Sequence, residues 1–268
     1  MGKIIAFSNQ KGGVGKTTTC VNMSAYLADK GYKVLIVDLD PQGNATSGLG
    51  FAKNEVKYSV YNVMIDETPI EQAVVKTCVD GLDILPSNID LVGAEVELVY
   101  IKDREHVLKT VIEPAKKTYD YIMIDCPPSL GLLTINALSC ADSVMIPIQS
   151  EYYAMEGLSQ LMNTIKLVVK HLNPGLKIEG VVLTMRDNRA IISKQIASEI
   201  KKFFGKRLYE TAIPRNIRLA EAPSHGVPIM MHDTRCSGAK AYHSLTEEFL
   251  SRQPASAKKK EEKAKESK

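Results

Sequence analysis

Short, continuously apolar runs alternate with amphipathic segments along most of this 268-residue chain. The apolar runs are typical of strands buried on both faces of a sheet, and we expect strands at 4–7, 33–38, 82–85, 119–125, 143–148, 178–184 and 208–213. Apolar residues spaced three and four apart predict helices at 19–28, 90–100, 105–117, 132–139, 158–172 and 191–204, with shorter ones near 59–65 and 70–75. This alternation predicts an α/β fold with a mostly parallel sheet flanked by helices on both faces.

A glycine-rich stretch, residues 10–18 (QKGGVGKTT), lies between the first predicted strand and the first predicted helix. This is the context of a phosphate-binding loop (P-loop), because glycines let successive backbone N–H groups point at phosphate oxygens. The start of the helix adds free N–H groups and a positive dipole end. Lys16 is the predicted partner of the β- and γ-phosphates, and the Thr17 hydroxyl that of Mg²⁺. The usual pattern begins with glycine at position 10, where this chain has Gln10, and the loop carries a second lysine, Lys11.

Two further polar segments follow predicted strands. Residues 38–46 (DLDPQGNAT) offer Asp38 and Asp40, and Asp125 ends the strand that precedes CPPS. Carboxyl ends of parallel strands meet at one edge of the sheet, where ligands bind, so we expect these loops to converge on the P-loop. Asp125 has the position at which P-loop enzymes keep an acid near Mg²⁺, directly or through water. One of the other two acids, Asp38 or Asp40, could position the attacking water.

Taken together, these segments resemble the ParA/MinD family of ATPases. Residues 11–18 (KGGVGKTT) are similar to that family's deviant phosphate loop, also called a deviant Walker A motif, and 38–44 and 125–129 to its two companion motifs. Residues 213–226 (IPRNIRLAEAPSHG) resemble the late segment of chromosome-partitioning ParA proteins of the Soj type. The resemblance runs from about residue 3 to about residue 250, so it covers nearly the whole chain.

The resemblance implies an ATPase that binds ATP and Mg²⁺ and forms a homodimer with two nucleotides sandwiched at its interface. Lys11 corresponds to the signature lysine, a cation that reaches the partner's ATP and neutralises charge developing on the transferring phosphoryl group. Asp40 corresponds to the acid needed for hydrolysis, and Thr17 to the Mg²⁺ ligand. Pro214 and Asn216 correspond to residues beside the adenine. The implied phosphate-binding residues are Lys11, Gly12, Gly13, Val14, Gly15, Lys16, Thr17 and Thr18.

The resemblance also implies two macromolecular partners. Dimers of this family bind double-stranded DNA without sequence preference, and a ParB-type centromere-binding protein stimulates their slow ATP hydrolysis. Arg189 and Arg218 fall where Soj-type members carry DNA-contacting arginines. The implied place of action is the bacterial cytoplasm, on the nucleoid. Lysines on or near the helix after Arg189 could extend a basic face for phosphate contacts: Lys194, Lys201, Lys202 and Lys206.

Composition sets the remaining bounds. The net charge of +3 resides in residues 254–268, with six lysines and three glutamates, so the first 253 residues are balanced. We expect a single ATPase domain over 1–253 and a charged, disordered tail over 254–268. Five cysteines without a C-x-x-C pair indicate reduced thiols in a cytosol. The sequence contains no run of 18 apolar residues, so we expect no membrane span.

Three alternatives remain open. A MinD-like positioning ATPase would end in an amphipathic membrane-binding helix, but 258–268 contains no large apolar residue. A metabolic P-loop enzyme, such as a ligase or small-molecule kinase, would need a second substrate pocket with catalytic groups, and the sequence indicates none. An iron protein would need cysteines at the dimer axis, for which Cys126 and Cys140 are the nearest candidates.

Overall fold

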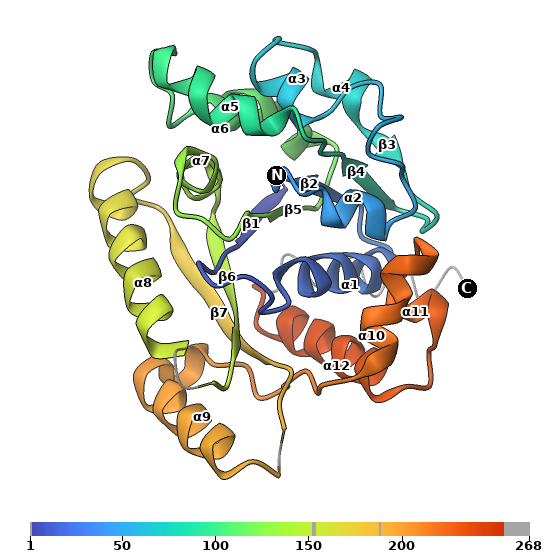
Figure 1. The fold of residues 1–268 in the computed structure, drawn as a ribbon, viewed down its shortest axis with the longest axis vertical. Coiled ribbons are helices and arrows are strands. Elements are labelled where there is room, and N and C mark those ends of the chain that lie inside the picture. The colour runs from blue at the N-terminus through green and yellow to red at the C-terminus, as the bar shows by residue number, and fades with distance from the viewer. Residues whose placement is uncertain (1, 152–153, 188, 255–268) are drawn as a thin grey trace.

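The computed structural model describes residues 2–151, 154–187 and 189–254. A seven-stranded sheet in the order β3-β4-β2-β5-β1-β6-β7 forms its centre (Figure 1). All neighbouring strands are parallel except β3 and β4. The strands span Lys3–Phe7 (β1), Val34–Asp38 (β2), Val75–Lys76 (β3), Leu82–Leu85 (β4), Tyr121–Asp125 (β5), Ser143–Gln149 (β6) and Lys177–Thr184 (β7). The predicted mostly parallel sheet is confirmed.

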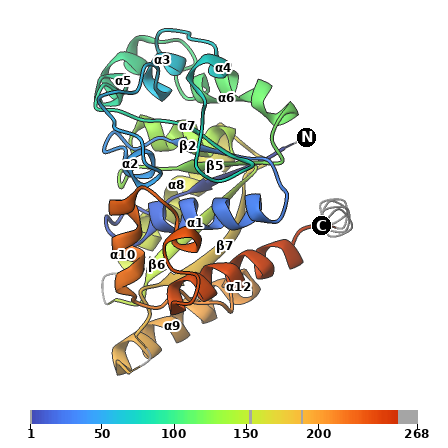
Figure 2. The same cartoon turned by 90° about the vertical axis from the view of Figure 1, so that its right-hand side faces the viewer.

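Helices cover both faces of the sheet (Figures 1 and 2). One face packs against α1 (Lys16–Asp29), α2 (Asn44–Gly48), α11 (Ile229–His232) and α12 (Ser237–Ser251), with α1 and α12 side by side. The other face packs against α3 (Val60–Met64), α4 (Ile70–Ala73), α5 (Leu91–Glu97), α6 (Val107–Ile112), α7 (Leu132–Cys140), α8 (Ala154–His171) and α9 (Ile191–Phe204). The helix α10 (Ile217–Glu221) and the 3₁₀ turns η1 (Leu98–Tyr100), η2 (Glu113–Lys117), η3 (Gly205–Arg207) and η4 (Ala222–His225) complete the described elements.

The central strands are continuously apolar because both of their faces are buried. In β1, Ile4 and Ala6 belong to one core cluster, and Ile5 and Phe7 to the cluster on the opposite face. All four side chains are fully buried. Alternate residues of a strand point to opposite faces, so a strand covered on both sides needs apolar residues throughout.

Most predicted elements are found close to their expected bounds, and the strand at 82–85 and the helix at 191–204 coincide with them. The predicted helices at 90–100 and 105–117 each finish as a 3₁₀ turn. Within the predicted short helix at 70–75, only the first four residues are helical, and Val75 begins β3. Residues 255–268, nearly all of the predicted tail, lie outside the described residues.

The predicted last strand, 208–213, is wrong. Leu208 makes an isolated parallel bridge to Val181 of β7, and the amides of Tyr209 and Ile213 donate to the Val181 and Leu183 carbonyls, but no strand forms. The amides of Glu210 and Thr211 instead donate to the two carboxylate oxygens of Glu248 on α12, each at 2.9 Å. The amide of Thr211, between the two residues that bond to β7, is therefore taken by α12, and this interrupts the strand ladder.

Candidate active site

The glycine-rich loop connects the end of β1 to the start of α1, as predicted. Gly13 and Gly15 have φ angles of 71° and 81°, in the left-handed region that favours glycine. Nothing lies within 4 Å of where a Cβ on Gly13 would stand, so this backbone borders open space. The first N–H groups of α1 have no partner within the helix, and they are available to an anion. The loop therefore has the form of a phosphate cradle.

Neighbouring strands hold the loop in place through side chains that the sequence analysis did not single out. Three hydrogen bonds pin the loop to β6 and β7: Asn9 Nδ2 to the Pro147 carbonyl (2.7 Å), Gln149 Nε2 to the Gly13 carbonyl (3.3 Å) and Thr184 Oγ1 to the Val14 carbonyl (2.7 Å). Gln149 and Thr184 end their strands. Polar residues closing apolar runs at the ligand-binding edge were the signal that could have identified them.

The two loop lysines have different environments. Lys16 is 6% exposed, and its Nζ donates back across the loop to the Lys11 carbonyl at 3.3 Å. Burial lowers the pKa of Lys16, while Asp125, Cys126 and Asp40 act in the opposite direction. The Lys11 side chain is 37% exposed, and its Nζ forms an ion pair with Glu151 at 2.6 Å. One amine therefore lies inside the site and the other lies at the surface.

Asp125 ends β5 beside the loop and is fully buried. Among the described residues, neither of its carboxylate oxygens has a hydrogen-bond partner of acceptable geometry. Burial, reinforced by Asp38, raises the pKa of Asp125 well above its usual range, and the Thr17 hydroxyl and Lys16 oppose this shift. A buried carboxylate without donors is costly unless a cation balances it. The carboxyl group of Asp125 and the hydroxyl of Thr17 are a donor set that suits Mg²⁺.

The structure distinguishes the two acids of the second loop. Asp38 is fully buried, and its Oδ2 accepts hydrogen bonds from the Thr46 amide (2.8 Å) and hydroxyl (2.7 Å). Burial raises the pKa of Asp38 to about 6, although these bonds oppose the shift. Asp40 accepts one bond, from the Gln42 amide to its Oδ1 at 2.9 Å. Asp38 thus holds the start of α2 in place, where a loop was expected, and Asp40 keeps its second oxygen for a ligand.

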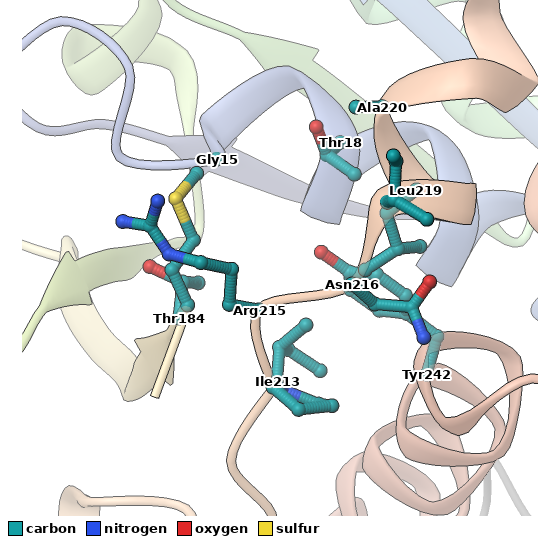
Figure 3. Close-up of a pocket in the computed structure, with 12 residues that line it drawn as sticks. Gly15, Thr18, Thr184, Ile213, Arg215, Asn216, Leu219, Ala220 and Tyr242 are labelled. Carbon is teal, nitrogen blue, oxygen red and sulfur yellow. The ribbon is translucent and has the colours of Figure 1, made fainter. Parts of the chain in front are cut away.

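A cavity of about 390 Å³ lies between the start of α1 and the late segment of the chain (Figure 3). It is lined by Gly15 and Thr18 of the loop and helix, Thr184 and Met185 after β7, residues 213–217, 219 and 220, and Tyr242 of α12. The predicted residues Pro214 and Asn216 are both in this lining. The apolar walls beside a phosphate cradle are suited to a flat heteroaromatic ring.

Asn216 also has a local structural role. Its Oδ1 accepts from the Arg218 amide at 2.8 Å and caps α10, and its Nδ2 donates to the Ser237 hydroxyl at 2.8 Å. Both ends of this amide are therefore occupied by the protein. The residue shapes the cavity wall through a capped helix start.

The two predicted DNA-contacting arginines lie on adjacent segments. An isolated bridge between Arg186 and Pro214 brings Arg186 and the adjoining Asp187 beside the segment that leads into α10. The Arg189 side chain is 92% exposed and pairs with Asp187 at 3.2 Å. The Arg218 side chain pairs with Glu221 at 2.8 Å.

A basic groove begins at the same segments. It has a volume of about 870 Å³, and cations from α9 and its surroundings line it: Arg186, Lys194, Lys201, Lys206 and Arg252. Glu210 is the one acid in this lining. Lys202 is exposed but is not part of it. Three of the four lysines considered from sequence therefore gather in one concave surface.

The sheet order, the strand–glycine loop–helix unit and the acids at the ends of β2 and β5 define a P-loop ATPase. The sequence comparisons then give the family. A family model described as an AAA domain matches residues 2–178. The chain is 58% identical over 248 residues to the sporulation initiation inhibitor protein Soj of Bacillus subtilis (strain 168), covering 92% of this chain and 98% of that protein. The chain belongs to the ParA/Soj family of chromosome-partitioning ATPases.

A second relative has a chromosome-partitioning name, and a solved structure with a different name has a similar fold. The chromosome partitioning protein ParA of Myxococcus xanthus is 50% identical over 252 residues, covering 94% of this chain and 89% of that protein. Among solved structures, a cobyrinic acid a,c-diamide synthase from Mycobacterium smegmatis with bound ADP and magnesium has a TM-score of 0.81 and 36% identity, covering 92% and 93% of the two chains. No helix in the described part of the chain has the length and apolar character needed to cross a bilayer.

Proposed function

We propose that this ATPase is a nucleotide-dependent switch for DNA partitioning, in which Mg-ATP closes a homodimer around two nucleotides. The observation that carries the proposal is the position of Lys11. Its amine lies at the surface, paired with Glu151, whereas the Lys16 amine lies across the phosphate-binding loop of its own chain. A second cation beside the cradle, directed away from it, is suited to the nucleotide of a facing subunit.

The site residues fit Mg-ATP. The backbone of residues 12–18 and the Lys16 amine would hold the phosphates, and Thr17 and Asp125 would hold Mg²⁺, directly or through water. When bound, Mg²⁺ neutralises phosphate charge. The adenine would occupy the cavity lined by Pro214 and Asn216. The unsatisfied carboxyl group of Asp125 supports this assignment independently of any resemblance.

Asp40 is the residue that we assign to hydrolysis. Its Oδ1 is oriented by the Gln42 amide, and its second oxygen is left to orient the attacking water. We assign Asp38 a structural role instead, because Thr46 donates twice to its Oδ2 and the Asp40 amide donates to its Oδ1. Asp40 would therefore act by orienting the water, from a loop that Asp38 holds in place.

The proposed DNA surface comprises Arg189, Arg218 and the basic groove along α9. Each arginine is paired with an acid of its own chain, so DNA phosphates must displace Asp187 or Glu221. We infer binding without sequence preference, because contacts between these side chains and the DNA phosphates carry no sequence information. A ParB-type protein would stimulate hydrolysis, after which the closed dimer opens because ADP lacks the γ-phosphate contacts that favour it.

We further infer that residues 1–253 act as one ATPase domain in the bacterial cytoplasm, on the nucleoid, with 254–268 as an appended tail. The experiment that tests the switch is light scattering with no nucleotide, with ADP and with a non-hydrolysable ATP analogue. The expected mass is 29.5 kDa in the first two cases and about twice that with the analogue. A protein that binds the analogue and stays monomeric would contradict the proposal.

A further inference from the structure

An apolar stripe runs along the outer side of α5 and the turn that follows it. It consists of four aliphatic side chains at helical spacing, each between 50% and 66% exposed: Ile89, Val92, Val96 and Val99. The adjoining Tyr100 is 86% exposed. The inner side of the same segment already supplies the core, through Leu91, Ala94 and Leu98, all fully buried. A surface helix needs one apolar side to pack, so this α5 stripe is in excess of what the fold requires.

Acidic side chains border the α5 stripe. On one side, the Tyr61 hydroxyl donates to Glu97 at 3.1 Å. This hydrogen bond and the desolvation of the hydroxyl raise the pKa of Tyr61, and the carboxylates of Asp66 and Asp90 act in the same direction. Glu95 is exposed on the same helix. Residues 89–101 contain no lysine or arginine.

The stripe adjoins the loops of the candidate active site. A Cβ on Gly131, in the segment that follows Asp125, would come within 2.3 Å of the Glu95 carboxylate. The Ser87 amide, just before the stripe, donates to the Thr46 hydroxyl at 2.9 Å, and that hydroxyl donates to Asp38. An occupant of the stripe would thus lie on a helix that contacts, through Glu95 and the residues before it, the loops of two of the three acids of the site.

We propose that the α5 stripe is a docking site for a partner protein segment in which apolar side chains are flanked by lysine or arginine. Charge complementarity selects this occupant. Two copies of the chain meeting stripe to stripe would bring Asp90, Glu95 and Glu97 against their own copies, and like charges at an interface are costly. The same acids repel an anionic lipid surface and the phosphates of DNA.

The test uses the full chain without nucleotide and a fluorescent amphipathic helical peptide made of leucine and lysine. Anisotropy is expected to detect binding that weakens with salt, while a matched peptide of leucine and glutamate does not bind. The double variant V92S/V96S should bind the lysine peptide about tenfold more weakly. Leu167→Ser is the matched control, because Leu167 is 60% exposed on α8, and it should bind like the wild type.

A charge-reversed variant sharpens the test. D90K/E95K should lose the lysine peptide and gain the glutamate peptide. Equal binding of the lysine peptide to the wild type and V92S/V96S would overturn the proposal. Self-association of the wild type through the stripe would also overturn it, as would binding to phosphatidylserine vesicles through the stripe, because each result would show a different occupant. The assay needs no nucleotide, so its failure would leave the proposed ATP switch intact.

Discussion

Asp38 and Asp125 lie directly opposite each other at the carboxyl ends of β2 and β5, yet in the described part of the chain Thr46 donates twice to Asp38 while neither oxygen of Asp125 has a well-placed partner. Two buried carboxyl groups in register repel one another when both are ionised. The Thr46 donors favour the charged form of Asp38, whereas Asp125 depends on a cation that the chain supplies only partly, through Lys16. This asymmetry separates a structural acid from one that is suited to Mg²⁺.

The first prediction concerns stability and pH. The pKa of Asp125 is raised in the folded state, so its contribution to stability is greatest when the group is protonated, below its unfolded pKa of about 3.8, and is lost as pH rises through the folded pKa. Asp125→Asn should therefore be more stable than the wild type without nucleotide at about pH 8, and this advantage should shrink towards about pH 4.5. Urea unfolding at both pH values measures it. An advantage that grew as pH fell would contradict the prediction.

The second prediction separates the two lysines of the loop. Lys16→Ala should lose measurable ATP binding, because it removes the buried cation that reaches across the cradle. Lys11→Ala should retain ATP binding within a few fold but lower turnover by about 100-fold, since its cation is supplied to the facing subunit. Fluorescent ATP titration and phosphate release measure the two effects. Lys30→Ala, at the far end of α1, is the control and should match the wild type in both. Equal losses in the two loop variants would contradict separate roles.

The third prediction concerns Asp40. Asp40→Ala should keep ATP binding and dimer formation but lower hydrolysis by about 100-fold, so that an ATP-bound dimer stays on DNA. The companion variant Asp38→Ala should instead lower the free energy of unfolding by about 2 kcal/mol or more, because it leaves the Thr46 amide and hydroxyl unpaired inside the protein. Phosphate release and urea unfolding provide the measurements. Rapid turnover in Asp40→Ala would remove this residue from the proposed chemistry.

The fourth prediction concerns DNA. Arg218→Glu and Arg189→Glu should each abolish DNA retention at moderate salt while dimerisation with ATP is unchanged. Lys201→Glu, in the basic groove, should weaken DNA binding and reduce its salt dependence by about one phosphate contact. Lys202→Glu makes the same charge change on the same helix outside the groove, so it is the matched control. Filter binding over a range of salt concentrations measures these effects. Equal losses for Lys201 and Lys202 would exclude the groove as part of the surface.

Elements with a strong apolar signal could be predicted from the sequence. The buried strands around the P-loop were found because continuous apolar runs follow from burial on both faces, and their order along the chain implied that their loops converge. The helix α12 was not predicted. Its buried residues Ala239, Tyr242, Leu245 and Phe249 recur at helical spacing, but small and polar residues, Gly238 and Thr246, lie among them and weaken the apolar signal. Residues 208–213 show the converse error, since the Glu248 carboxylate from that helix interrupts the expected strand pairing.

The roles of individual site residues also differed in whether the sequence could predict them. The glycines and Lys16 were evident from the motif, because their chemistry is local. The residue pattern alone left the choice between Asp38 and Asp40 open, and only the family resemblance pointed to Asp40. The physical reason depends on Thr46 folding back at the start of α2, which the sequence does not show. Asn9, Gln149 and Thr184 were missed because what they contribute to the loop is a contact between strands distant in the sequence.

Because β6 and β7 anchor the P-loop, the motif depends on this fold for its conformation. Its nine residues, placed at another strand–helix junction, would lack the hydrogen bonds that Gln149 and Thr184 donate to the loop carbonyls. The grafted glycines would then sample many backbone conformations and would lose that freedom each time a phosphate bound. In this chain the ordering is completed during folding, so an arriving nucleotide meets N–H groups that are already in position.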